Sequence, residues 1–378
     1  EGVALADCSA AARTAGCAVV RELASINAVV IEVPLERVAF AAARLAGNSR
    51  VERVDASPVK NWLKNVRRPS SGALPDFAFP DPGLLPRFAR PVPLDASDAA
   101  DLEQPWGVQR VKAALAWPRG QGAGVKVAVI DTGIDRAHAE LAGNVAGGFN
   151  ALTNGKPDDW QDEEGHGTHV AGTIAALRDG KGVVGVAPSA RLYAVRVLDK
   201  DGNGTYDDVI AGLEWAAANG MQIANMSLGA DEGSEPLHRA VKAATAKGLV
   251  IIAASGNSGS SVNFPARYPE TIAVGASDKN DKLAFFSSRG PEVDFIAPGV
   301  DIPSLKLGGG HDTLSGTSMA APHVTGLAAL AVSLGARDVR KALGSASSPL
   351  PGMDDNAQGG GLADAGRLRA NDTMLASR

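Results

Sequence analysis

From about residue 101 onward, short apolar runs rich in β-branched residues alternate with segments of helical periodicity. The clearest runs span residues 125–130, 192–197, 223–226, 249–253 and 271–274. Each run is apolar at consecutive positions, which is typical of a strand covered on both faces. Their alternation with helices predicts an α/β fold, a doubly wound parallel sheet with helices on both sides.

Two segments place side chains suited to acid–base chemistry at the ends of predicted elements. Asp131 directly follows the run 125–130 and precedes a glycine turn, at the carboxyl end of a strand, where parallel sheets hold their sites. The segment Gly-His-Gly-Thr-His-Val-Ala-Gly-Thr, residues 165–173, places His166 at the start of a second small-residue helix. His169, one helical turn later, is interpreted as a packed structural histidine. The alternative, a zinc site shared with His166, would need further ligands.

A third segment, Leu-Ser-Gly-Thr-Ser-Met-Ala-Ala-Pro-His-Val over residues 314–324, contains a candidate nucleophile, Ser318, at the start of a helix. Small neighbours would let a carbonyl group approach its hydroxyl, and the helix start favours a developing negative charge. We expect Pro322 to lie in the first turn, where its missing N–H is not needed. The alternative is that Ser318 only caps the helix.

The order Asp131, His166, Ser318 is the aspartate–histidine–serine order of subtilisin. The surrounding motifs, Asp-Thr-Gly-Ile-Asp, His-Gly-Thr-His-Val-Ala-Gly-Thr and Gly-Thr-Ser-Met-Ala-Ala-Pro-His, resemble those of subtilisin-like serine proteases (subtilases) over about residues 101–370. The resemblance implies a serine endopeptidase in which Ser318 is the nucleophile, His166 the general base and Asp131 its orienting carboxylate. It also implies that Asn257 donates to the oxyanion with the Ser318 N–H. The alternative is that Asn257 only forms a turn.

The same resemblance implies where a peptide substrate binds. The segments 202–206 and 226–229 would hold the substrate between them as an added strand, through main-chain hydrogen bonds. The first pocket would have small walls that favour a large apolar or aromatic side chain, with Asn263 making its base more polar. The residues expected to contact the substrate are Gly202, Asn203, Gly204, Ser227, Leu228, Gly229, Ala254, Gly256 and Asn263.

The resemblance further implies a structural Ca²⁺ ion, for which carboxylate and carbonyl oxygens are the usual ligands. The sequence departs from the family pattern in two ways. Glu140 stands where a ligand aspartate is usual, and the positively charged Arg178 and Lys181 flank the loop carboxylate of Asp179. The expected ligands are Glu140, Leu177, Asp179, Lys181 and Val183. A weaker second candidate combines Asp278 with the carbonyl groups of Ala266 and Tyr268.

Residues 1–63 are expected to form a separate small α+β domain of ferredoxin-like fold. Residues 28–33 predict a strand, residues 35–46 an amphipathic helix and residues 51–56 a second strand. The stretch Ser-Arg-Val-Glu-Arg-Val-Asp, residues 49–55, resembles the inhibitory propeptide of extracellular subtilases; an unrelated α+β domain is the alternative. The resemblance implies that the chain up to Leu63 lies in the active-site cleft and is cut after that residue.

The proline-rich segment 64–100 is expected to be an extended linker, followed by a catalytic domain over residues 101–378. Cys8 and Cys17, the two cysteines, could form a local disulfide or remain free thiols. A net charge of −5 argues against nucleic acid as a main partner, and no stretch is apolar enough for a membrane span.

We therefore expect a secreted, monomeric zymogen whose partners are protein substrates and its own propeptide. The alternative is a catalytically idle complex in which the propeptide is never released. An intracellular subtilase fits a long propeptide less well.

Overall fold

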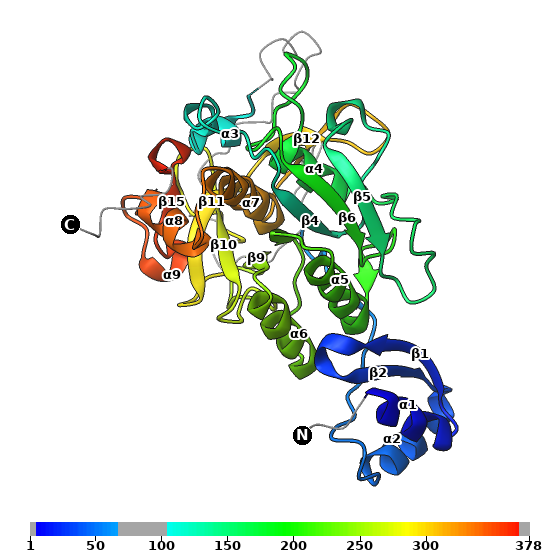
Figure 1. Cartoon of the computed structure of the whole chain (residues 1–378). Coiled ribbons are helices and arrows are strands. Elements are labelled where there is room, and N and C mark those ends of the chain that lie inside the picture. Colours follow the sequence, from blue (N-terminus) through cyan, green and yellow to red (C-terminus); the bar gives the residue numbers. More distant parts are fainter. Residues whose placement is uncertain (1–4, 67–103, 370–378) are drawn as a thin grey trace, which may run out of the picture.

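The computed structural model describes residues 5–66 and 104–369. A nine-stranded sheet runs through the larger body, in the order β14–β15–β11–β10–β9–β8–β4–β6–β5 (Figure 1). Its neighbouring strands are parallel except for the edge pair β14 and β15. The strands are β4 Lys126–Asp131, β5 Val145–Asn150, β6 Arg191–Arg196, β8 Ile223–Met226, β9 Val250–Ala254, β10 Ile272–Ser277, β11 Val293–Pro298, β14 Ser347–Ser348 and β15 Leu362–Ala363.

Helices cover both faces of this sheet (Figure 1). Helices α4 (His166–Ala175) and α7 (Thr317–Ser333) lie in one apolar core, which contains Val170 and Leu327. Helices α5 (Tyr206–Ala218) and α6 (Glu235–Ala246) lie in the other, which contains Leu213 and Val241. The predicted doubly wound α/β fold is therefore confirmed.

Shorter elements surround the sheet. A hairpin of two antiparallel strands, β12 and β13, leads directly into α7. Strands β3 and β7 pair as a separate two-stranded ladder. The bounds are α3 Trp106–Arg110, β12 Ile302–Leu305, β13 His311–Leu314, α8 Val339–Ala346, α9 Asp355–Gln358, β3 Lys60–Asn61 and β7 Asn203–Gly204, with 3₁₀ turns at Ala24–Ile26, Leu35–Arg37, Ala113–Leu115, Ala139–Leu141 and Ala365–Arg367. In the described parts of the chain, no helix is long and apolar enough to cross a membrane.

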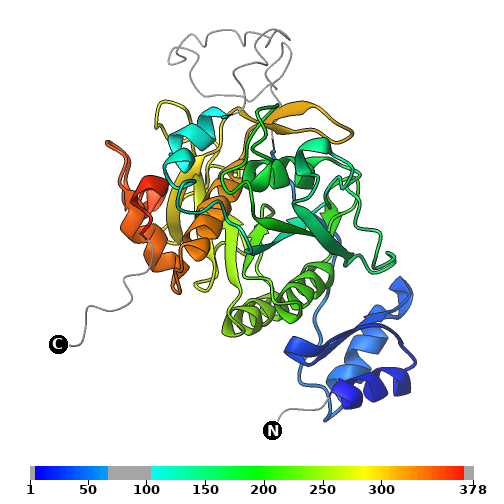
Figure 2. The same cartoon turned by 45° about the horizontal axis from the view of Figure 1, so that its top comes forward.

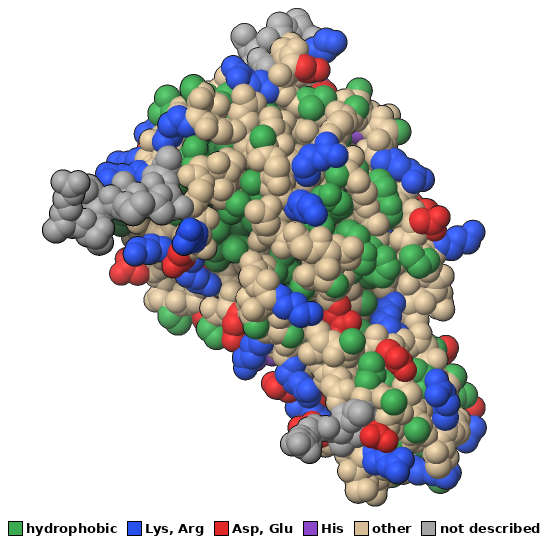
Figure 3. Space-filling view, viewed as in Figure 1, with side chains coloured by type: hydrophobic (Ala, Val, Ile, Leu, Met, Phe, Trp, Pro, Cys, Tyr) green, Lys and Arg blue, Asp and Glu red, His purple; other side chains and the backbone are tan. Residues whose placement is uncertain are grey.

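The N-terminal residues form a second, smaller unit beside α5 and α6, drawn in blue in Figures 1 and 2. It consists of α1 (Leu5–Thr14), β1 (Ala18–Leu23), β2 (Ala28–Glu32) and α2 (Val38–Ala46), with β1 and β2 antiparallel. Its own small core contains Ala12, Cys17, Ala41 and Leu45. In the space-filling view this unit is a separate lobe, with side chains of both charges on its surface (Figure 3).

The predicted strand over residues 51–56 is wrong, because the structure gives this stretch no strand pairing. Only Val51 packs against the small core, while the charged residues 52, 53 and 55 are exposed. The sheet described for the small unit therefore has two strands rather than the larger number that a ferredoxin-like fold requires. Of the predicted linker, residues 67–100 lie outside the described part of the chain.

Candidate active site

Asp131 is the last residue of β4, a strand in the interior of the sheet, and its side chain is fully buried. Its Oδ1 accepts a hydrogen bond from the backbone N–H of Thr132 at 2.8 Å. The same oxygen accepts one from Nδ1 of His166, also at 2.8 Å. The structure therefore brings together the first two residues predicted for catalysis.

His166 is the first residue of α4 and follows Gly165, whose φ of 108° lies in the left-handed region that favours glycine. Burial alone would lower the pKa of His166. The charge and hydrogen bond of Asp131, with the charges of Glu164 and Asp162, outweigh burial and raise this pKa above its ordinary value. Within residues 5–66 and 104–369, the buried Nε2 atom has no hydrogen-bond partner, so it can accept a proton from a group in the cleft.

Asp162 holds this pair in place and was not found by sequence reasoning. Its Oδ1 accepts from Thr132 Oγ1 at 2.9 Å and from the N–H groups of Glu164 and Gly165 at 3.0 and 2.9 Å. Its Oδ2 accepts from the N–H and Oγ1 of Thr168 at 2.9 and 2.6 Å. It thereby ties the end of β4 to the start of α4. Its position in an acidic run before the histidine was the available signal, but the two neighbouring glutamates give the same signal.

Ser318 is the second residue of α7, in the first turn, where backbone N–H groups have no intrahelical acceptor. Its Oγ donates to the carbonyl oxygen of Ser227 at 3.0 Å. The placement of Pro322 in the first turn is wrong, because α7 begins at Thr317 and Pro322 lies in the second turn. The carbonyl group of Ser318, four residues earlier, accepts instead from Ser227 Oγ at 2.7 Å.

Asn257 follows β9 and reaches the start of α7. Its Oδ1 accepts from both the N–H and the Oγ1 of Thr317, at 2.8 and 2.9 Å. Because the oxygen is occupied on that side, Nδ2 is directed toward the cleft, where it lies 3.5 Å from the carbonyl oxygen of Lys64. The amide thus has the orientation that an oxyanion donor needs.

His169 and His323 are both fully buried and bonded to backbone carbonyl groups. His169 Nε2 lies 3.0 Å from the oxygen of Ile302, and His323 Nδ1 lies 2.8 Å from the oxygen of Met319. Burial and the nearby His166 lower the pKa of His169 to about 3, and burial lowers that of His323 to about 4. Both histidines are therefore neutral packing residues. Among the described residues, no group of three or more histidine, cysteine or acidic side chains could hold a metal ion.

The cleft between the predicted substrate-binding segments contains the chain's own residues 60–64. Strand β3 pairs antiparallel with β7, so Lys60 lies opposite Gly204. The N–H of Trp62 donates to the oxygen of Gly202, and the carbonyl of Trp62 accepts from the N–H of Gly229, both at 3.0 Å. This main-chain pattern is that of a peptide bound as an added strand.

Side chains of the same segment also fit the cleft. Trp62 is 2% exposed, meets the ring of Tyr206 edge-on at 5.1 Å, and donates from Nε1 to the oxygen of Gly204 at 3.0 Å. Lys60 forms an ion pair of 2.7 Å with Glu232 at the rim. The cleft thus has a deep aromatic subsite close to an acidic rim.

The predicted first pocket is assembled around Asn263. Gly256, with φ of 112°, packs so closely that a Cβ there would lie 2.8 Å from Cγ of Asn263. A Cβ on Gly229 would lie 3.2 Å from the Cβ of Asn263. Ala254 ends β9 and Leu228 follows β8, and both are buried. The structure therefore packs the two predicted pocket glycines against the asparagine.

The expected calcium ligands do not form a calcium site. The two oxygens of Glu140 accept from His311 Nε2 and from the N–H of Val183, each at 2.8 Å, and the carboxylate fills the space above Gly182. Asp179 Oδ1 accepts from the N–H of Lys181 at 3.1 Å. The backbone N–H of Leu177 donates to the backbone carbonyl oxygen of Glu140 at 2.9 Å.

The contact between Glu140 and His311 shifts the pKa values of both side chains. Burial alone would raise the pKa of Glu140, but the hydrogen bonds from His311 and Val183 and the charges of His311 and His138 hold it below its usual range. The hydrogen bond to Glu140 raises the pKa of His311. In this structure both oxygens of the Glu140 carboxylate are therefore bonded to protein donors.

The members of the second calcium candidate have separate hydrogen-bond partners. Thr271 Oγ1 lies 3.1 and 2.8 Å from the carbonyl oxygens of Ala266 and Tyr268. Asp278 Oδ1 instead accepts from the N–H groups of its own loop, at residues 280 and 282. Arg340 binds the nearby carboxylate of Asp294 and the carbonyl oxygen of Thr271.

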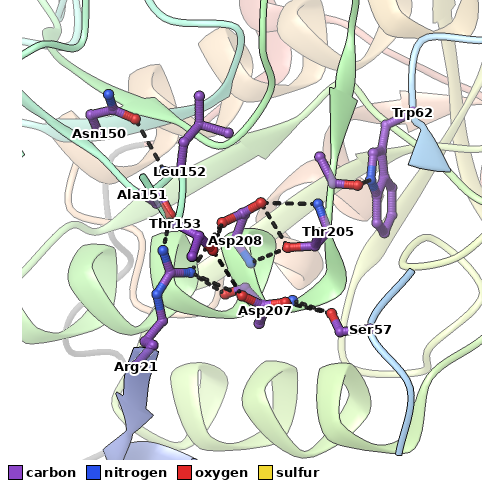
Figure 4. A network of polar contacts seen from close by, with 11 residues as sticks. Arg21, Ser57, Trp62, Asn150, Ala151, Leu152, Thr153, Thr205, Asp207 and Asp208 are labelled. Atoms are coloured by element: carbon purple, nitrogen blue, oxygen red, sulfur yellow. Dashed lines mark hydrogen bonds and ion pairs between the residues drawn. The ribbon is translucent and has the colours of Figure 1, made fainter. Parts of the chain in front are cut away.

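Arg21 joins the N-terminal unit to the larger body (Figure 4). Its guanidinium donates to the oxygen of Ala151 at 2.5 Å and lies 3.4 and 3.2 Å from the carboxylates of Asp207 and Asp208, in the first turn of α5. Ser57 Oγ donates to Asp207 at 2.5 Å, as the chain passes toward the cleft. These polar contacts are partly buried, and the N-terminal unit is thus docked through a network that the sequence did not predict.

The two cysteines are free thiols in the structure. Cys17 lies in the small core, while Cys8 is half-buried and its Sγ lies 3.9 Å from the carbonyl oxygens of Asn27 and Arg50. The sequence left open a disulfide or two free thiols, and the structure has two free thiols.

Comparison with known proteins agrees with this geometry. A model of the subtilase family matches residues 122–361. Subtilisin BL of Lederbergia lenta is 54% identical over 228 residues, which are 60% of this chain and 83% of that protein. M-protease of Shouchella clausii is 53% identical over 228 residues, and Subtilisin E of Bacillus subtilis is 51% identical over 235, the matches covering 59% and 61% of those proteins. The chain therefore belongs to the subtilase family and is a subtilisin-like serine endopeptidase.

Proposed function

We propose that Asp131, His166 and Ser318 hydrolyse peptide bonds as a catalytic triad, with Asn257 as oxyanion donor. The observation that carries this proposal is the 2.8 Å hydrogen bond between His166 and the fully buried Asp131. It fixes the imidazole through Nδ1 and leaves Nε2 without a hydrogen-bond partner among the described residues. The orientation of the Asn257 amide, held by Thr317, supports the proposal.

The reaction begins when the Ser318 hydroxyl turns from Ser227 toward His166 and attacks the carbonyl carbon of the scissile bond. His166 Nε2 takes the hydroxyl proton, and the carboxylate of Asp131 stabilises the imidazolium. The oxygen of the tetrahedral intermediate accepts from Asn257 Nδ2 and the Ser318 N–H.

The intermediate collapses when His166 returns its proton to the leaving amine and the C–N bond breaks. This leaves an ester between the substrate and Ser318. Water then attacks the ester, again with His166 as base, and releases the carboxylic acid and the free serine hydroxyl.

We further propose that residues 1–63 are an inhibitory propeptide, with residues 64–100 as its linker. Occupation of the cleft by residues 60–64 supports this, as does the docking network around Arg21. The first cut is proposed at the bond after Lys64, one residue beyond the position expected from sequence, because the carbonyl oxygen of Lys64 is the one that faces Asn257. The partners are then protein substrates and the propeptide itself, and a protease blocked in this way suits export as a monomer.

A general fluorogenic peptide substrate and intact-mass analysis test the proposal. The wild-type chain should cut itself and then hydrolyse the substrate, whereas folded Ser318→Ala should do neither. Activity in folded Ser318→Ala would reject the triad. An uncut, inactive wild-type chain would favour the idle complex. Mixing the Ser318→Ala chain with trace active enzyme identifies the first bond broken.

A further inference from the structure

A proline in the nucleophile helix leaves the nucleophile's own carbonyl group without a helical partner. In α7 the N–H of residue 322 would bond the carbonyl oxygen of Ser318, but Pro322 has no N–H. Both residues are buried. A buried carbonyl oxygen without a donor is costly, so another group must supply the bond.

Ser227 supplies it from the end of β8. Its hydroxyl donates to the carbonyl oxygen of Ser318 at 2.7 Å and accepts from Asn225 Nδ2 at 2.9 Å. Asn225 Oδ1 in turn accepts from Thr325 Oγ1 at 2.8 Å, about two turns after Ser318 in α7. Each of these three side chains is fully buried.

The three hydrogen bonds that link Ser318, Ser227, Asn225 and Thr325 form a relay that starts and ends on α7. It leaves the helix at Ser318, crosses to the strand through Ser227 and Asn225, and returns to the helix at Thr325. Because every hydrogen bond in it has a fixed donor and acceptor, the strand sets the position of the Ser318 carbonyl group. Ser318 carries both the nucleophilic oxygen and an oxyanion N–H, so its backbone position governs both.

We propose that the Ser227 hydroxyl is a positioning residue, which replaces the helical donor lost at Pro322 and holds the nucleophile for attack. This inference rests on the proposed triad. The role belongs to the hydroxyl and is separate from substrate binding by the Ser227 backbone, because Ser227→Ala removes the hydroxyl and keeps the backbone.

The test is a double-mutant cycle, which compares the wild type with Ser227→Ala, Pro322→Ala and the double variant. Ser227→Ala should lower kcat by about tenfold or more with KM nearly unchanged, since small displacements of a reacting group cost up to about 10²-fold. In the double variant, the new N–H of residue 322 can bond the Ser318 carbonyl oxygen, so most of the lost kcat should return. The rate of inactivation by phenylmethanesulfonyl fluoride, which reacts with the nucleophile, should follow kcat.

Ser347→Ala is the matched control, because it removes a serine hydroxyl that donates to a helix carbonyl group, that of Leu343 in α8. It should leave kcat and the inactivation rate unchanged. If Ser227→Ala does not fold, Thr325→Val removes the far end of the relay and should lower kcat in the same direction.

A Ser227→Ala enzyme with the wild-type kcat overturns the proposal, and so does a double variant no faster than Ser227→Ala. If Ser227→Ala cannot be obtained folded, a Thr325→Val enzyme with the wild-type kcat overturns it. Failure of the triad itself is distinguished because it would leave Ser318→Ala active, whatever the cycle gives.

Discussion

Replacing Trp62 by alanine should release the segment that blocks the cleft. The indole is almost completely buried, contacts Tyr206 and donates to the oxygen of Gly204. Truncation of a buried tryptophan to alanine costs about 3–5 kcal/mol. We take about 3 kcal/mol, because the main-chain bonds of Trp62 remain, and about 1.4 kcal/mol per factor of ten gives about a 100-fold rise in the undocked population.

Limited proteolysis with trypsin measures that population directly. The bonds after Lys60 and Lys64 lie in the docked segment, so trypsin can cut them only in chains where the segment has left the cleft. When undocking is fast relative to cleavage, the cutting rate follows the open population. The experiment uses the Ser318→Ala chain, which should not cut itself, and mass spectrometry to identify the two products. Trp62→Ala should raise both cutting rates by about 100-fold.

Val59→Ala is the matched control, because Val59 lies beside the same segment and is 69% exposed. It should leave the cutting rates close to those of the parent chain. Equal rates for the Trp62→Ala and Val59→Ala chains would refute the reasoning, since burial of the indole would then contribute nothing to docking.

Three further predictions concern the site and the loops around it. The pKa of His166 is raised above its ordinary value of 6.5, and only the neutral imidazole is a base. In a pH–rate profile, kcat/KM should therefore fall with decreasing pH from a midpoint above 6.5, and Asp131→Asn should move that midpoint down. His166→Ala should lower kcat by about 10²–10⁴-fold, whereas His169→Ala should lower the melting temperature and keep most of kcat, and the reverse pattern would exchange their roles. Because His311 occupies Glu140, neither Ca²⁺ nor a chelator should change the melting temperature of the Ser318→Ala chain, and a clear rise with Ca²⁺ would restore the calcium site.

Sequence patterns predicted the interior of the sheet better than its margins. The five predicted runs correspond to β4, β6, β8, β9 and β10, in which consecutive apolar residues are buried on both faces. Strand β5 was missed because it contains two glycines and lies at the sheet edge, and β11 because an aspartate interrupts its apolar run. The predicted strand at residues 51–56 failed because only its first apolar side chain has a core to pack against.

In the candidate site, the sequence predicted which residues come together but not how they are oriented. Asn257 is a donor toward the cleft only because Thr317 occupies its oxygen. Asp162 gave no distinct signal, since its importance lies in hydrogen bonds to both sides of a turn. The role of the Ser227 hydroxyl follows from the position of Pro322 within α7, which depends on where the helix begins.

The contacts of Glu140 could not be predicted, because its side-chain partner is distant in sequence. His311 follows Glu140 by 171 residues, so no local pattern could show that the carboxylate already has a hydrogen-bond partner. The two bonds of Glu140 also connect the chain segments that carry the triad. Glu140 follows Asp131, Val183 follows the helix that begins at His166, and His311 stands on the strand that leads to Ser318. A carboxylate held in this way by protein donors can align the three catalytic segments without an added ion.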